Sequence, residues 1–233
     1  VLPHEFRVLP VDSLEAMATA IRTMQLRGAP LIGAAAAYGM MLGMGEDPSD
    51  PGLARSLAIL EATRPTAVNL RWALDRARER LALLAPVERE AAALELAREI
   101  CQEDVATNRA LGRHVLDLIR TLGVAHRPVR ILTHCNAGWL ATVDWGTATA
   151  GIYMAHDEGL PVHVWVDETR PRRQGGRLTA WELGKHGVPH TVVPDTAAAH
   201  LLARSAVAMV VVGPGRTPAP GAVATNAGPY ARG

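Results

Sequence analysis

The chain has 233 residues and a mass of 24.8 kDa, with 48% hydrophobic and 20% charged residues, which is typical of a globular protein of one large or two small domains. Lys and Arg total 24 against 23 Asp and Glu, so no global field draws the chain to nucleic acid or to an anionic membrane. Two cysteines are too few for a disulfide framework, and neither a signal peptide nor an apolar run of roughly 20 residues is present. We therefore expect a reduced, cytoplasmic protein.

The first half of the chain shows apolar residues at helical spacing, as in Leu14, Met17, Ala18 and Ile21. Prolines and glycines interrupt this pattern at intervals. It predicts a helical N-terminal domain over residues 1–122, with helices at 13–26, 31–44, 51–62, 67–84 and 87–122.

The rhythm changes after residue 128 to short β-branched runs that alternate with helices. Strands are expected at 129–133, 162–166, 190–193 and 207–212, with helices at 142–157, 178–186 and 197–204. This alternation indicates an α/β domain over residues 129–212 with a parallel sheet. Residues 213–233 contain five Gly and four Pro without periodicity, which predicts a loop or disordered tail.

The turn Arg27-Gly28-Ala29-Pro30 is the first candidate binding feature. Gly28 can end one helix and Pro30 can open the next, so free helical amides and the Arg27 guanidinium could meet a phosphate. A tight turn with a solvated arginine explains the same residues, and on these four alone it is the better interpretation. Arg64, before the expected helix at 67–84, allows the same two interpretations.

Cys135 is a stronger candidate because it follows an apolar strand at the point where open parallel sheets bind ligands. We expect a helix to begin here, and a helix start lowers a thiol pKa. A buried cysteine that packs as a small hydrophobe is the equal alternative for Cys135, and for Cys101 it is the preferred one. His134 should point to the opposite face.

Polar residues also end the next two strands. Asp167 to Arg170 could form a structural network or a helix cap. Asp195 ends the third strand, and Gln174 is expected in a glycine-flanked loop, which suggests ligand contact. The nine histidines are scattered rather than spaced as metal ligands, so no metal is predicted. Neither a Gly-x-Gly-x-x-Gly nor a Walker sequence occurs, so no nucleotide cofactor is predicted.

Seven motifs occur in order over nearly the whole chain and resemble one family. They are Leu2-Pro3-His4-Glu5, Arg27-Gly28-Ala29-Pro30, Thr63 to Leu70, Glu103 to Arg109, Thr133 to Gly138, Val164 to Pro171, and Gln174-Gly175 with Arg177 to Leu183. They look like the motifs of methylthioribose-1-phosphate isomerase, a family similar to the regulatory subunits of translation initiation factor 2B.

This resemblance implies a helical N-terminal domain, a Rossmann-like C-terminal domain and a homodimer. It also implies the isomerisation of 5-methylthioribose 1-phosphate to 5-methylthioribulose 1-phosphate in methionine salvage, an aldose-to-ketose conversion of a small phosphorylated sugar without metal or nucleotide. Carried over by position, Cys135 matches the catalytic cysteine. The family's substrate contacts match Arg27, Gly28, Ala29, Arg64 and Gln174.

The last residues depart from the family pattern. Gly215 stands where the family has the aspartate of a Gly-Ala-Asp-Arg turn, and Pro220 to Ala222 and Thr225 to Pro229 replace its Asn-Gly-Asp and Asn-Lys signatures. The family also continues beyond the position of Gly233, which suggests a truncated or degenerate homologue or an altered tail. Two hypotheses follow: an isomerase, which needs a carboxylate near Cys135, or a catalytically impaired sugar-phosphate or nucleotide-binding regulator, which does not.

Overall fold

A computed structural model describes residues 2–122 and 128–213 of the chain. Its contacts divide the chain into two compact units. The helical unit comprises Val8–Ala106 and Ala141–Val143, and the sheet unit comprises Val1–Arg7, Thr107–Leu140 and Asp144–Gly233. The division falls inside one long helix, α5 (Pro86–Thr121), whereas the sequence pattern predicted it at residue 122. From residue 214 on, the predicted tail lies outside the described residues.

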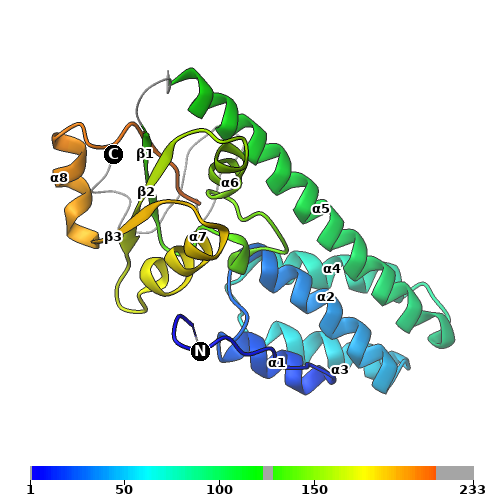
Figure 1. Cartoon of the computed structure of the whole chain (residues 1–233). Helices are drawn as coiled ribbons and strands as arrows, with labels where there is room; N and C mark the ends of the chain where they lie inside the picture. The colour runs from blue at the N-terminus through cyan, green and yellow to red at the C-terminus, as the bar shows by residue number, and fades with distance from the viewer. Residues whose placement is uncertain (1, 123–127, 214–233) are drawn as a thin grey trace. The chain divides into compact units, whose positions relative to one another are not determined.

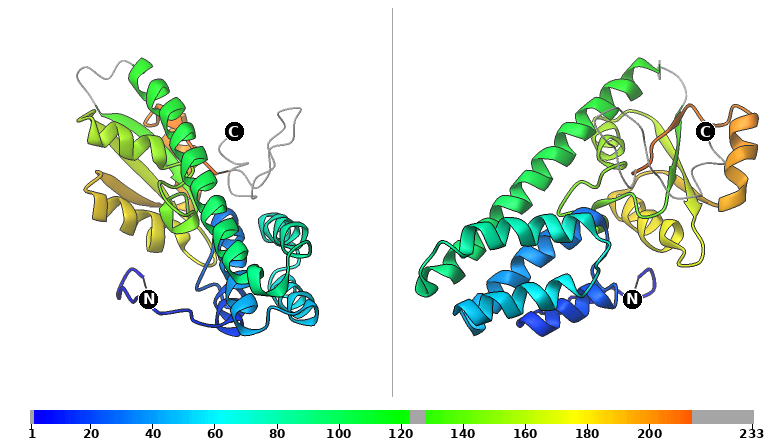
Figure 2. Two further views of the ribbon diagram at one scale, coloured as in Figure 1. Left: turned by 90° about the vertical axis from the view of Figure 1, so that its right-hand side faces the viewer. Right: turned by 180° about the vertical axis from the view of Figure 1, so that it is seen from behind.

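The helical unit consists of four helices and the first part of a fifth, and their arrangement is drawn in Figures 1 and 2. They are α1 (Leu14–Arg22), α2 (Ala29–Glu46), α3 (Asp50–Glu61), α4 (Val68–Leu81) and the first part of α5. The core consists of Leu, Ile, Met and Ala side chains, with α2 packed against α1, α3 and α4. Glycines let the neighbours approach α2 closely, since a Cβ on Gly39 would meet the Leu60 side chain at 2.9 Å. Helical periodicity predicted all five helices, with ends that differ by a few residues.

The sheet unit contains four parallel strands in the order β3-β2-β1-β4. They are β1 (Val129–His134), β2 (Val162–Glu168), β3 (His190–Pro194) and β4 (Met209–Val210). Successive strands are connected through α6 (Ala150–Asp157), α7 (Ala180–His186) and α8 (Ala198–Ala203) (Figure 1). This arrangement confirms the predicted α/β class with a parallel sheet. Within the described ranges, no helix combines the length and the apolarity needed to cross a membrane.

The pairing register of β1 and β2 sorts their side chains onto two faces. Val129 pairs with Val162, and the register continues to His134 opposite Asp167. Because side chains alternate along a strand, the odd positions of β1 and the even positions of β2 share one face. That face is buried under α6, α7 and the last part of α5, in a core that includes Ile131, Val164, Ile152, Leu183 and Leu116.

The connection between β1 and α6 differs most from the prediction. A helix was expected over residues 142–157, but α6 begins only at Ala150. Trp145 and Gly146 have φ values of 70° and 76°, and this left-handed backbone cannot continue a helix. We expected a helix from the glycine- and alanine-rich composition of this segment. Composition does not show where the chain turns. The helix expected at 178–186 begins earlier, as a π-helical turn at Gly175–Thr179 that continues into α7.

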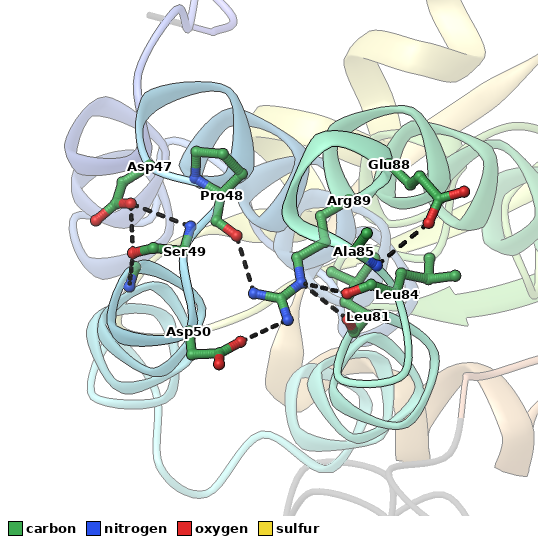
Figure 3. A network of polar contacts seen from close by, with 10 residues as sticks. Asp47, Pro48, Ser49, Asp50, Leu81, Leu84, Ala85, Glu88 and Arg89 are labelled. Carbon is green, nitrogen blue, oxygen red and sulfur yellow. Dashed lines mark hydrogen bonds and ion pairs between the residues drawn. The ribbon is translucent and has the colours of Figure 1, made fainter.

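A buried arginine near the start of α5 holds the helical unit together (Figure 3). The side chain of Arg89 is 4% exposed. Its Nε donates to the carbonyls of Leu81 and Leu84 at 3.0 and 3.2 Å, its Nη1 to Pro48 at 2.9 Å, and its Nη2 pairs with Asp50 at 2.6 Å. The last carbonyls of a helix lack partners within the helix. Arg89 therefore supplies at the end of α4 the donors that water would otherwise provide.

Replacing Arg89 should destabilise the helical unit. We expect Arg89→Met to lower the free energy of unfolding by about 3 kcal/mol, because it leaves buried carbonyls without donors. The matched control is Arg78→Met, since Arg78 pairs with Asp75 at 2.8 Å on an exposed surface, where such pairs contribute about 1 kcal/mol or less. Urea unfolding followed by circular dichroism measures both variants. Similar losses in the two variants would contradict the structural role of Arg89.

Candidate active site

Cys135 follows directly after β1, at the carboxyl edge of the sheet. Its φ is 64°, a left-handed conformation that residues other than glycine rarely adopt. The chain therefore turns sharply at the thiol-bearing residue. The prediction that a helix begins here is wrong, because α6 starts at Ala150 and only a three-residue turn, Trp139–Ala141, lies between. A helix dipole acts within its first turn, so it does not account for a thiolate at Cys135.

A buried hydroxyl holds the backbone of this turn. Thr179, the last residue of the π-helical turn, donates to the carbonyl of Cys135 at 2.7 Å and accepts from the amide of Ala137 at 3.1 Å. The Thr149 hydroxyl donates to the carbonyl of Ala137 at 3.3 Å. Backbone groups on both sides of Asn136 are therefore held in place by side chains from other elements. The sequence interpretation assigned no role to Thr179.

The side chain of Asn136 lies in the same turn without hydrogen bonds of its own. Both Oδ1 and Nδ2 are buried, and neither has a partner within the described part of the chain. A carboxamide offers two donors and one acceptor, and a buried polar group without a partner is costly. A ligand with hydroxyl groups bound at this edge would satisfy both atoms.

Glu182 of α7 supports the turn from its buried side. The residue is fully buried, its Oε1 accepts from the Leu140 amide at 3.2 Å, and its Oε2 accepts from the Tyr153 hydroxyl at 3.3 Å. A Cβ on Gly138 would collide with Oε2. Glycine at position 138 is therefore what lets the carboxyl group reach the backbone of the turn.

The environment of Glu182 changes its ionisation. Burial raises the pKa of Glu182 from 4.5 to about 7, and hydrogen bonds from the Leu140 and Trp139 amides and from Tyr153 oppose this shift only in part. Burial, followed by the negative charge of Glu182, also raises the pKa of Tyr153. The phenol therefore stays protonated and remains a donor to the carboxyl group.

Gln174 occupies the residue before the π-helical turn, so it begins a helix and does not lie in a loop. Its Oε1 accepts from the Thr169 hydroxyl at 2.6 Å, and its backbone amide donates to the same hydroxyl at 3.0 Å. Thr169 follows β2, so this pair fixes the segment that connects β2 to α7. The carboxamide nitrogen of Gln174 is the group that a ligand at this edge could use.

The Arg27-Gly28-Ala29 turn lies in the helical unit and leads into α2. Gly28 has a φ of 104° and no side-chain cap, with Pro30 in the first turn of the helix. A Cβ on Gly28 would collide with the backbone of Ala141. The close approach and the positive φ both require glycine here. This geometry leaves the first amides of an 18-residue helix available to an anion.

Arg64 precedes a second helix start in the same unit, because α4 begins at Val68. The starts of α2 and α4 are neighbours, since a Cβ on Gly33 would lie 3.1 Å from the backbone oxygen of Asn69. Two helix N-termini, each preceded by an arginine, therefore come together within the helical unit. Cys135 and Gln174 belong to the sheet unit.

The sheet unit also brings together three residues that the sequence did not connect. His134 is the last residue of β1, Asp167 is the last but one of β2, and Asp195 directly follows β3; their ligand atoms lie within 4.8 Å of one another. Along the chain, His134 and Asp167 are 33 positions apart and Asp167 and Asp195 are 28 positions apart, so no short spacing motif reveals the cluster. Only the strand register could have predicted the cluster.

Substitution of Gly138 should disturb the Cys135 turn. We expect Gly138→Ala to cost about 2 kcal/mol or more of unfolding free energy, because the new Cβ meets a buried carboxyl group rather than a flexible surface atom. Gly184→Ala in α7 is the control, because its Cβ would meet the His190 ring at an ordinary 3.5 Å. Alanine also favours the helix there. A cost at Gly184 that equals the cost at Gly138 would contradict the proposed support of the turn.

Glu182 should impose a pH dependence on stability. Because its pKa is raised in the folded protein, the free energy of unfolding should fall as pH rises from about 4.5 to about 7 and then level off, by about 3 kcal/mol in total. Glu182→Gln keeps an acceptor but has no proton to lose, so it should lack this fall. Chemical unfolding of both proteins at several pH values measures the difference. A difference that stays constant across this window would contradict the raised pKa.

Comparison with known proteins identifies close relatives. The chain is 59% identical over 98% of its length to the methylthioribose-1-phosphate isomerase of Rhodospirillum rubrum, and 56% identical over 98% to that of Gluconobacter oxydans. These matches cover 60% and 63% of the two relatives. The chain therefore spans less than two thirds of their length.

Solved structures and a family model agree with these relatives. The chain is similar to 5-methylthioribose 1-phosphate isomerase from Pyrococcus horikoshii, with a TM-score of 0.87 and 37% identity over 98% of this chain and 65% of that one. It is also similar to subunit delta of translation initiation factor eIF-2B from A. fulgidus, with a TM-score of 0.81 and 36% identity over 92% of this chain and 64% of that one. The model of the initiation factor 2 subunit family matches residues 25–231. The chain belongs to the initiation factor 2 subunit family.

Proposed function

We propose that this protein is an aldose–ketose isomerase that converts 5-methylthioribose 1-phosphate to 5-methylthioribulose 1-phosphate. The observation that carries the proposal is the 59% identity over 98% of the chain to a methylthioribose-1-phosphate isomerase, together with a cysteine at the sheet edge in a tightly held turn. Such identity over this length is difficult to reconcile with a different substrate class. The product would enter methionine salvage.

The phosphate would bind to the helical unit. The first amides of α2 and the guanidinium groups of Arg27 and Arg64 are the groups in that unit suited to an anion. Gly28 and Ala29 would contribute backbone contacts, because the positive φ of Gly28 opens the start of the helix. Gln174 would hold a sugar hydroxyl through its carboxamide nitrogen.

Cys135 would transfer a proton at the reacting carbons. Isomerisation moves hydrogen between adjacent carbons, so it needs groups that give and accept protons within hydrogen-bond reach of both. Thr179 donates to the carbonyl of Cys135 and accepts from the amide of Ala137, and these two hydrogen bonds fix the backbone that carries the thiol. Gly215, which replaces the family aspartate, lies outside the described residues. Asp195 is the partly exposed carboxylate at the same sheet edge that could serve as the second group.

A catalytically impaired regulator is the second candidate function. The observation that favours it is the similarity to subunit delta of initiation factor eIF-2B, at 36% identity and a TM-score of 0.81. Such a protein would bind a sugar phosphate or a nucleotide without converting it. In either case we propose a cytoplasmic homodimer, as the family resemblance implies.

Substitution of the two cysteines separates the candidates. In the full-length gene product, Cys135→Ala should lower kcat for 5-methylthioribose 1-phosphate by about 100-fold to 10,000-fold, the usual contribution of a general acid–base group. Cys101→Ala is the control, because Cys101 lies in the middle of α5 and burial raises the pKa of its thiol. Product is measured by coupled assay, and substrate binding by calorimetry. Binding without turnover in the unmodified protein would favour the regulator, and loss of both would overturn the proposed substrate.

A further inference from the structure

Three potential metal ligands project from one face at the carboxyl edge of the sheet. His134 pairs with Asp167 in the register of β1 and β2, and Asp167 pairs with Val193 in that of β2 and β3. Asp195 begins the short 3-10 turn directly after β3, and its Oδ1 lies 3.5 Å from Nδ1 of His134. The face that carries His134 and Asp167 is opposite the one that packs against α6 and α7. The three ligand atoms lie within 4.8 Å of one another.

The distances in this cluster are unsuited to direct hydrogen bonds. Nδ1 of His134 lies 3.5 Å from Asp167 Oδ2 and 3.5 Å from Asp195 Oδ1, whereas N–H···O bonds span roughly 2.7 to 3.2 Å. The His134 side chain is 8% exposed, yet Nδ1 makes no hydrogen bond within the described structure. A buried imidazole nitrogen is thus aimed between two carboxylates without bonding to either.

The two His134 distances suit an ion placed between the three ligand atoms, which all lie within 4.8 Å of one another. His nitrogen and Asp oxygen bind Zn²⁺ at about 2.1 Å, and tetrahedral angles at that length place two ligand atoms roughly 3.4 Å apart. The geometry points to a site for a divalent transition-metal ion, with Zn²⁺ the best match, held by His134, Asp167 and Asp195.

The donor set and the burial favour this class of ion. One imidazole with two carboxylates suits Zn²⁺ and neighbouring transition metals, whereas Mg²⁺ and Ca²⁺ take sets made of oxygen. The two carboxylates would contribute negative charge to the coordination of the ion. Asp167 is fully buried, while the Asp195 side chain is 31% exposed. Asp195 therefore marks the side from which an ion and a fourth ligand, such as water, would enter.

The ion would tie together the ends of three strands. It would cross-link β1, β2 and the residue after β3 immediately beside Cys135. Asp195 is also the candidate second proton-transfer group, so the test of the ion uses binding and absorption spectra rather than turnover. Binding of the ion can therefore be tested without reference to isomerase activity.

Metal binding is measured on the full-length protein without an affinity tag, after treatment with a chelator. Titration with Zn²⁺ by calorimetry should show one site per chain in the parent protein. In Asp195→Asn the Kd of this site should rise by at least about 10-fold to 100-fold. Co²⁺ should give visible absorption bands of a tetrahedral site in the parent protein. Asp195 is partly exposed, so Asp195→Asn should fold, and His134→Gln with a circular dichroism check provides a second variant.

The control is a surface pair of the same chemistry. His186 Nε2 lies 2.7 Å from Asp157 Oδ1, a hydrogen-bond distance that leaves no room for an ion. His186→Gln should therefore bind Zn²⁺ as the parent does. Stoichiometric binding that Asp195→Asn and His134→Gln both abolish supports the site. Failure to bind Zn²⁺ at neutral pH, or binding that His186→Gln weakens as much as Asp195→Asn does, overturns it.

Discussion

The parallel pairing of β1 with β2 is the constraint on which the functional edge of the sheet depends. The register runs from Val129 opposite Val162 to His134 opposite Asp167. A shift of one residue would exchange the two faces of β1, placing His134 in the apolar core and Ile131 at the other face. The apolar face beneath α6 and α7 therefore determines which polar residues meet at the carboxyl edge. Cys135 is presented there because it is the first residue after a strand whose position is set by burial.

The turn after β1 is stabilised by a compromise between burial and polarity. A fully buried carboxyl group normally costs free energy, and the raised pKa of Glu182 reflects that cost. The hydrogen bonds from the Leu140 amide and the Tyr153 hydroxyl offset part of it. Together with the bonds to Thr179, these contacts hold the backbone from Cys135 to Leu140 in one conformation, although the segment forms no regular helix. The absence of a Cβ at Gly138 is the condition for this arrangement.

The elements were largely predictable from sequence, while the site geometry was only partly so. Apolar periodicity located the helices of the helical unit, and β-branched runs located the strands, because both patterns report burial of one face. The same reasoning failed between Cys135 and Ala150. Trp145 has a left-handed backbone there, which the composition of the segment does not predict. For the same reason Thr179 and Glu182 were named in a motif without a role. Their partners in the Cys135 turn lie about 40 positions away in the sequence, so no local pattern connects them.

The hydrogen bonds that hold the Cys135 turn act on its backbone and not on the side chains it presents. Thr179 bonds to the carbonyl of Cys135 and the amide of Ala137, and Glu182 accepts from the amide of Leu140. These hydrogen bonds do not involve the side chains at positions 135 and 136, although the left-handed φ of Cys135 restricts which residues suit position 135. A relative could change both and keep the fold, which agrees with TM-scores of 0.87 to an isomerase and 0.81 to an initiation factor subunit. Two solved structures with different names, an isomerase and an initiation factor subunit, thus share this fold, and a fold alone does not determine a function.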